Sequence, residues 1–203
     1  MIQGFRKNIV ILFAVMFLVL PLAANDLEDL RTTMESKVEE ILKTLKDPKL
    51  LQCEQDMKIS KLADGMFDYE LMAKLSIGKR NWRKFSASQR KEFIDLFVIR
   101  MKESYTQKAH LLSDEKVTVG DAVQVKPNRV YLTVLIHGSK NNTDIKYKYY
   151  KDRSGKWLIY DVEIAKISIL QTYRAQFAEV LSSKSVEELL HELKNPKTKK
   201  ISS

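Results

Sequence analysis

The sequence is poor in the residues that characterise disulfide-rich or repetitive proteins, since its 203 residues include one cysteine, four prolines and six glycines. A single cysteine excludes a disulfide framework, a zinc ribbon and every CxxC redox motif. So few glycines and prolines also exclude collagen-like chains and chains dominated by linkers. Cys53 has Leu50, Leu51 and Met57 as apolar neighbours, so we expect a small buried residue there rather than a nucleophile.

Common catalytic and metal-binding motifs are missing as well. The sequence contains no GxSxG, no HExxH and no glycine-rich phosphate-binding loop. The three histidines, His110, His137 and His191, lie far apart and have no acidic residues at ligand spacing, which argues against a metal site. We therefore expect a protein that is not an enzyme and that needs no cofactor and no metal.

One pair of carboxylates leaves an enzymatic alternative open. Asp161 and Glu163 share one face of a predicted strand and could place two acids in a cavity, where general acid–base chemistry becomes feasible. The favoured interpretation places both on the solvent-exposed face of the strand. Under that interpretation, the residues that point inward are Leu158, Tyr160, Val162 and Ile164.

The composition that remains is that of a globular protein with a basic surface. Hydrophobic residues make up 44% of the chain and charged residues 30%, which is enough for one domain with a proper core. The formal net charge of +9 leaves three classes of partner open, namely nucleic acid, an anionic membrane and an acidic protein. A basic surface that serves only solubility is a fourth possibility.

The first 24 residues have the layout of a secretory signal peptide. Arg6 and Lys7 precede an unbroken apolar run over 9–20, and Pro21 and small residues up to Ala24 follow it. The apolar run is short for a membrane span, although an uncleaved anchor is the alternative. We predict cleavage near Ala24 and export, which makes nucleic acid the least favoured partner. Residues 25–195 would form a single domain, and 196–203 a mobile basic tail.

Periodicity divides this domain into helical ends and a strand-rich centre. Apolar residues three and four apart predict helices, and capping boxes at Ser86, Ser168 and Ser185 mark three helix starts. Alternating apolar and polar residues predict four strands joined by short turns. Helices are expected over 26–46, 50–63, 68–77, 86–112, 168–181 and 185–193, and strands over 117–125, 130–136, 145–149 and 157–164. The prediction is an α+β fold in which N-terminal and C-terminal helices cover a four-stranded antiparallel meander and enclose an apolar cavity.

Methionine and aromatic residues supply the candidate lining of that cavity. Such side chains suit a pocket for apolar ligands of variable shape, although the same pattern at helical spacing is also typical of an ordinary core. The candidate lipid-binding residues are Met66, Phe67, Phe93, Phe97, Met101, Tyr105, Tyr147, Tyr149, Ile164, Tyr173 and Phe177.

Two long segments carry an ordered set of motifs. Tyr160 to Leu181 contains an aromatic-Asp-Val strand end, a Ser-opened helix and a Tyr-Arg-x-x-Phe core. Phe67 to Phe97, followed by Tyr105, contains a Leu/Ile-Gly pair, a Trp and a Ser-x-x-Gln-Arg cap. In this order the motifs resemble those of the MlaC family of periplasmic phospholipid-binding proteins. Two departures are Ala165-Lys166, where the family usually has glycine, and Gln171-Thr172, where an asparagine often precedes the tyrosine.

The resemblance implies a soluble periplasmic carrier that moves phospholipid between the membranes of the envelope. Its partners would be an outer-membrane lipoprotein–porin complex and an inner-membrane ABC transporter complex, and the carrier would be a monomer without nucleic acid, nucleotide or metal. Arg174 is the nearest matched cation and would either hold the lipid headgroup at the rim or pair with Asp161 or Glu163. The alternative function is an exported adaptor that binds no lipid and docks through its basic face.

Overall fold

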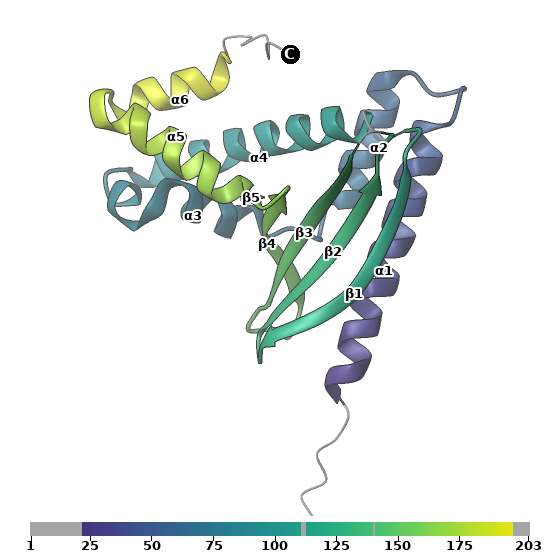
Figure 1. The fold of residues 1–203 in the computed structure, drawn as a ribbon. Helices are drawn as coiled ribbons and strands as arrows, with labels where there is room; N and C mark the ends of the chain where they lie inside the picture. Colours follow the sequence, from purple (N-terminus) through teal and green to yellow (C-terminus); the bar gives the residue numbers. More distant parts are fainter. Residues whose placement is uncertain (1–21, 111–112, 140, 197–203) are drawn as a thin grey trace, which may run out of the picture.

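The computed structural model describes residues 22–110, 113–139 and 141–196, which form six helices and one antiparallel sheet (Figure 1). The predicted signal peptide lies outside the described residues up to position 21, as does the predicted basic tail from 197 onward. The helices are α1 (Leu22–Leu45), α2 (Gln52–Ala63), α3 (Tyr69–Trp82), α4 (Ala87–His110), α5 (Ile169–Ser183) and α6 (Val186–Lys194). None of the helices within these ranges is long and apolar enough to cross a membrane.

The sheet confirms the predicted meander and adds one short strand. Its strands follow the chain in the order β1-β2-β3-β4-β5, and every neighbouring pair is antiparallel. The strands are β1 (Lys116–Lys126), β2 (Arg129–His137), β3 (Asn142–Lys151), β4 (Trp157–Ile164) and β5 (Ile167–Ser168). The last strand has two residues, too few for alternation to be visible in the sequence.

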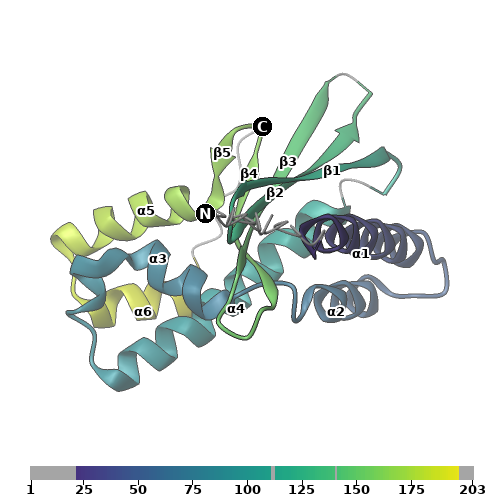
Figure 2. The same cartoon turned by 90° about the horizontal axis from the view of Figure 1, so that it is seen from below.

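One face of the sheet packs against α1 and forms the first of two apolar cores. Strand β2 alternates strictly, so that Val130, Leu132, Val134 and Ile136 are buried while their neighbours are not. Met34 of α1 packs on this face, and Figures 1 and 2 show α1 running along the sheet. The predicted amphipathic N-terminal helix is therefore the cover of the sheet.

The second core lies within the helices at one end of the sheet. Helices α3, α4, α5 and α6 pack together there, separate from the face that α1 covers (Figure 2). Their fully buried centre is aromatic, with Phe93 and Phe97 of α4 beside Phe177 of α5. The predicted capping boxes at Ser86 and Ser185 are present and fix the starts of α4 and α6.

A bulge in β4 corrects two predictions about that strand. Lys148 of β3 pairs with Asp161, whereas Tyr149 pairs with Ile159, so Tyr160 is an extra residue that shifts the alternation by one. Ile159 is therefore fully buried, and the predictions that Leu158 and Tyr160 point into the core are wrong.

Cys53 is also placed differently from the prediction. It is exposed near the start of α2, where neighbouring Leu51 and Met57 are exposed as well. The apolar neighbours in the sequence therefore did not indicate a buried segment.

Candidate functional site

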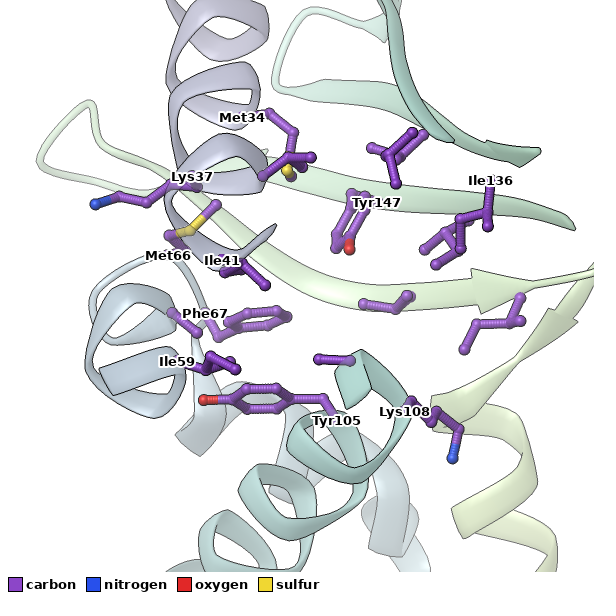
Figure 3. Close-up of a pocket in the computed structure, with 18 of the residues that line it drawn as sticks. Met34, Lys37, Ile41, Ile59, Met66, Phe67, Tyr105, Lys108, Ile136 and Tyr147 are labelled. Atoms are coloured by element: carbon purple, nitrogen blue, oxygen red, sulfur yellow. The ribbon is translucent and has the colours of Figure 1, made fainter. Parts of the chain in front are cut away.

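An apolar pocket lies between the sheet and the helices α1, α2 and α4 (Figure 3). Its walls come from the stripe of α1, the buried side of α2 with the segment after it, the C-terminal half of α4, the face of β1–β4, and the first residue of α5. The volume is about 180 Å³. The lining residues are Met34, Lys37, Val38, Ile41, Leu42, Leu45, Ile59, Ala63, Met66, Phe67, Met101, Ser104, Tyr105, Lys108, Ala109, Val117, Val134, Ile136, Ile145, Tyr147, Val162, Ile164 and Ile169.

Six of the eleven candidate residues lie in this lining. They come from the segment between α2 and α3, from α4, and from β3 and β4, which the fold brings together around one space. They are Met66, Phe67, Met101, Tyr105, Tyr147 and Ile164. Contact between these six side chains and a lipid stays a prediction.

The other five candidates are not part of the pocket lining. Phe93, Phe97, Tyr173 and Phe177 belong to the helical core, where their rings contact one another at centroid distances of 5.4 to 6.1 Å. Tyr149 is buried in the sheet core and is not part of the pocket lining. The helical repeat of aromatic residues was thus a packing signal, because α3 and α6 pack on α4 and rings of α5 contact Phe93 and Phe97.

Sequence reasoning missed one whole wall of the pocket, which α1 forms. Val38, Ile41 and Leu45 belong to the apolar stripe that predicts the helix over 26–46, and such a stripe is typical of a helix packed on a core, but these residues line the pocket. No signal separates the two cases, because a stripe that faces a hollow and a stripe that faces side chains have the same periodicity. Lys37 and Lys108, which also line the pocket, were missed as well.

The few polar groups of the lining have distinct positions. The Tyr105 hydroxyl donates a hydrogen bond of 3.2 Å to the carbonyl of Ser60, so it is directed into the protein and its ring forms the wall. The hydroxyl of Tyr147 is drawn toward the middle of the hollow in Figure 3. Burial among apolar side chains raises the pKa of Tyr147 to about 12, which keeps this hydroxyl protonated and able to donate.

Two ammonium groups lie at the edges of the pocket. Figure 3 shows the charged ends of Lys37 and Lys108 pointing away from the apolar interior. Lys37 lies 3.6 Å from the carboxylate of Glu40, one turn further along α1. Lys108 donates a hydrogen bond of 3.2 Å to the hydroxyl of Ser104, which also lines the pocket. The structure thus provides a cation and a hydroxyl side by side at the α4 edge.

A buried ion-pair network fixes the wall where β4 turns into α5. Lys148 lies 3.0 Å from Asp161 and 2.8 Å from Glu163, which are therefore neither a catalytic pair in the pocket nor partners of Arg174. The Ser168 hydroxyl donates to both oxygens of Asp161 at 2.9 Å, and the backbone N–H of Leu170 donates at 3.3 Å. Asp161 is 5% exposed, so its prediction as a solvent-facing residue is wrong.

The turn inside this network explains one departure from the family pattern. Ala165 and Lys166 have φ values of +47° and +68°, a left-handed conformation that glycine adopts without cost. The turn between β4 and β5 therefore requires the backbone that a glycine would supply, and this chain forms it with ordinary residues.

Because of this ion-pair network, we expect the protein to lose stability in acid. Hydrogen bonding and charge from Lys148 hold the pKa of Glu163 below its usual range. Because the pKa of Glu163 is lower in the folded than in the unfolded protein, its ionised carboxylate stabilises the fold at pH values above its unfolded-state pKa of about 4.3. This contribution is lost as the pH falls through the folded-state pKa. We expect the urea midpoint to fall less between pH 6 and pH 3 in Glu163→Gln than in the unchanged protein. Equal falls in the two proteins would contradict this assignment.

Arg174 lies away from the pocket. It is exposed on α5, and its guanidinium packs on Gly78 of α3. It is absent from the lining, so the sequence-based assignment of Arg174 as a rim residue has no support from the position of this side chain. Lys148, and not Arg174, pairs with Asp161 and Glu163 because it lies directly opposite Asp161 on the neighbouring strand.

These features define a class of protein: an α+β domain with an apolar pocket between a curved sheet and its covering helices. Among the described residues there is no cluster of three or more side chains suited to hold a metal ion. Such a pocket, apolar with few polar groups at its edge, is of the kind that takes up a hydrophobic ligand.

Comparison with known proteins gives the family. The model of the MlaC protein family matches residues 35–195, and the chain belongs to this family. Members of the family are non-enzymatic lipid carriers, in agreement with the prediction that this protein is not an enzyme. A search of curated proteins returns no match.

One solved structure is similar over most of the chain. It is the phospholipid-binding protein from Ralstonia solanacearum, determined in complex with a phospholipid. The identity is 22%, the TM-score is 0.67, and the similarity covers 81% of this chain and 94% of the other. At this level of identity the likeness shows that the two proteins share a fold.

Proposed function

We propose that the protein is a soluble phospholipid carrier of the periplasm that holds the acyl chains of its ligand in the apolar pocket. The observation that carries this proposal is the pocket itself, because its walls are apolar and its cations stand at the edges. Membership of the MlaC family supports it, as does the shared fold with a protein determined in complex with a phospholipid.

Solvation energy makes such a carrier necessary for transport through water. Burying one CH₂ group is worth ~0.8 kcal/mol, so one chain of ~16 carbons avoids on the order of 13 kcal/mol of unfavourable hydration. The hollow of about 180 Å³ is smaller than the ~300–1,000 Å³ of typical ligand pockets. Its walls therefore move apart as a chain enters, and the flexible side chains of Met34, Met66 and Met101 permit this rearrangement.

The headgroup is expected at the α4 edge of the pocket. A phosphate is costly to bury without paired charges, so it stays where Lys108 and Ser104 can contact it. Replacing Lys108 by alanine removes about 1 kcal/mol of attraction and is expected to slow uptake of phosphatidylglycerol by about fivefold. Uptake is measured with labelled lipid in vesicles. Lys91→Ala on the same helix, where the side chain is 82% exposed, is the matched control and is expected to leave uptake unchanged.

The Tyr147 hydroxyl is expected to donate a hydrogen bond to an ester carbonyl of the bound lipid. Tyr147→Phe keeps the ring and removes the donor, so affinity for phospholipid is expected to fall by about five- to tenfold. Tyr105→Phe is the control, because the hydroxyl of Tyr105 bonds to Ser60 and not to the hollow. Competition binding with a fluorescent phospholipid measures both variants, and equal affinities would show that Tyr147 contributes only its ring.

The carrier role beyond binding includes delivery to partners in the two membranes. In this proposal the protein is a monomer that exchanges phospholipid with an inner-membrane ABC transporter complex and an outer-membrane lipoprotein–porin complex, as the family resemblance implies. The test is transfer of labelled phospholipid between donor and acceptor vesicles in two compartments. A porous membrane between them passes the protein and retains the vesicles. Transfer that rises in proportion to protein concentration supports the carrier role, and transfer no faster than the protein-free rate would contradict it.

A further inference from the structure

A second hollow, of about 520 Å³, lies between α3 and α5 and differs in character from the apolar pocket. Its lining includes Lys79, Arg80 and Lys84 near the end of α3, and Arg174 of α5. We name these four residues the cationic hollow. It shares no lining residue with the apolar pocket, and Figures 1 and 2 show α3 and α5 side by side in the helical part of the molecule.

The charge of the cationic hollow is not compensated. Its lining contains no acidic residue, and in the described part of the chain none of its four cations forms an ion pair. This distinguishes the site from the outer faces of α1, α3 and α4, which carry ion pairs one turn apart, such as Lys74 with Glu70. Four like charges held together are unfavourable unless an anion joins them.

The backbone is shaped to hold one of these cations in place. Gly78 interrupts α3 with φ +73°, and a carbon atom added there would lie 3.3 Å from Nε of Arg174 and 3.4 Å from Nη2. The guanidinium thus packs flat on a bare stretch of backbone. The small residues Ala178 and Ser182 of α5 leave the remaining space open. The site is therefore a concave, partly fixed arrangement and not only a run of basic residues.

We infer that the cationic hollow binds the phosphate groups of anionic lipid headgroups at a membrane surface. Guanidinium groups bind phosphate oxygens in pairs, and several cations around a concave space suit a compact group with many oxygens. Each Lys or Arg near an anionic membrane contributes attraction that falls off within a Debye length. The hollow would hold the carrier at an anionic surface, and this inference does not depend on what the apolar pocket contains.

The test compares two double variants of equal charge. Arg80→Gln with Lys84→Gln removes two cations from the hollow, and Lys58→Gln with Lys61→Gln removes two exposed lysines from α2. The measurement is the partition coefficient of the protein onto vesicles containing phosphatidylglycerol at low salt. It is expected to fall about 30-fold in the first variant, because each of the two cations removed contributes about 1 kcal/mol of attraction. The second is expected to change by less than about threefold. Millimolar inorganic phosphate is expected to displace the unchanged protein from the vesicles.

Three results would overturn the inference. Equal losses in both variants would show that only net charge matters. Binding to polyglutamate without binding to the vesicles would identify an acidic protein as the partner. Binding of inorganic phosphate without binding to the vesicles would make the hollow a site for free phosphate. The lipid content of each purified variant, measured by mass spectrometry, separates this question from the carrier proposal, because substitutions in the hollow are expected to leave it unchanged.

Discussion

Replacing Ala109 with tryptophan is expected to reduce the phospholipid held per protein molecule by about tenfold or more. Ala109 lines the apolar pocket from α4, so an indole at this position takes up free space that a lipid chain would enter. Excluding two methylene groups costs ~1.6 kcal/mol at ~0.8 kcal/mol each, which exceeds the ~1.4 kcal/mol that corresponds to a factor of ten. The measurement is lipid extraction and quantification against protein.

A second substitution, in the opposite wall of the pocket, tests whether any loss of lipid comes from filling the pocket and not from a local disturbance of α4. Ile145→Trp introduces the same side chain from β3, where Ile145 also lines the pocket. Ala175→Trp is the matched control, because Ala175 is exposed on α5 and lines neither hollow. The account expects low lipid content in both pocket variants and normal content in the control. Normal content in both pocket variants, with unchanged circular dichroism, would place the ligand elsewhere.

Asp161→Ala is expected to have the largest effect on stability, a loss of ~3 kcal/mol in the free energy of unfolding. The substitution removes one carboxylate of a buried ion-pair network and leaves Lys148, the Ser168 hydroxyl and the Leu170 N–H without this acceptor. Breaking a buried pair by removing one partner typically costs ~3–5 kcal/mol, and Glu163 compensates in part because it also contacts Lys148. Urea unfolding followed by circular dichroism measures the change.

The control for this prediction is an exposed aspartate. Asp121 has a side chain that is 91% exposed and lies 4.0 Å from Arg31, so Asp121→Ala is expected to change stability by less than ~0.5 kcal/mol. Asp161→Asn is expected to lose less than Asp161→Ala, because the amide oxygen still accepts from Ser168. Similar small losses in all three variants would show that the network contributes little to the fold.

The helices, the strands β1–β4 and the order of the meander could be predicted from the sequence, because they depend on signals between residues close together in the chain. The hydroxyls of Ser86, Ser168 and Ser185 accept hydrogen bonds from backbone N–H groups three residues further on, and strand alternation follows from the pleat. The register between β1 and β2 shifts between Val119 and Ala122, where Gly120-Asp121 interrupts the alternation in the sequence. The bulge at Tyr160 was not predicted, because neither glycine nor proline marks it.

Residue type and periodicity do not separate the wall of a pocket from a filled core. Met66, Phe67 and Tyr147 line the pocket, whereas Phe93 and Phe177 lie in the helical core. Periodicity tells which side of an element is covered, and not whether the cover fills the space. That difference depends on how α1 and the helical core are arranged relative to the sheet, which is a property of the tertiary structure.

The central claim is that the apolar pocket holds phospholipid acyl chains, and the most direct measurement is the lipid content of the protein as purified. The protein should be isolated without detergent from the periplasm of a Gram-negative host, extracted with organic solvent and analysed by mass spectrometry. The account predicts phospholipid in the extract, in an amount that falls when Ala109 or Ile145 is replaced by tryptophan. Extracts without phospholipid, from protein shown to be folded, would contradict it.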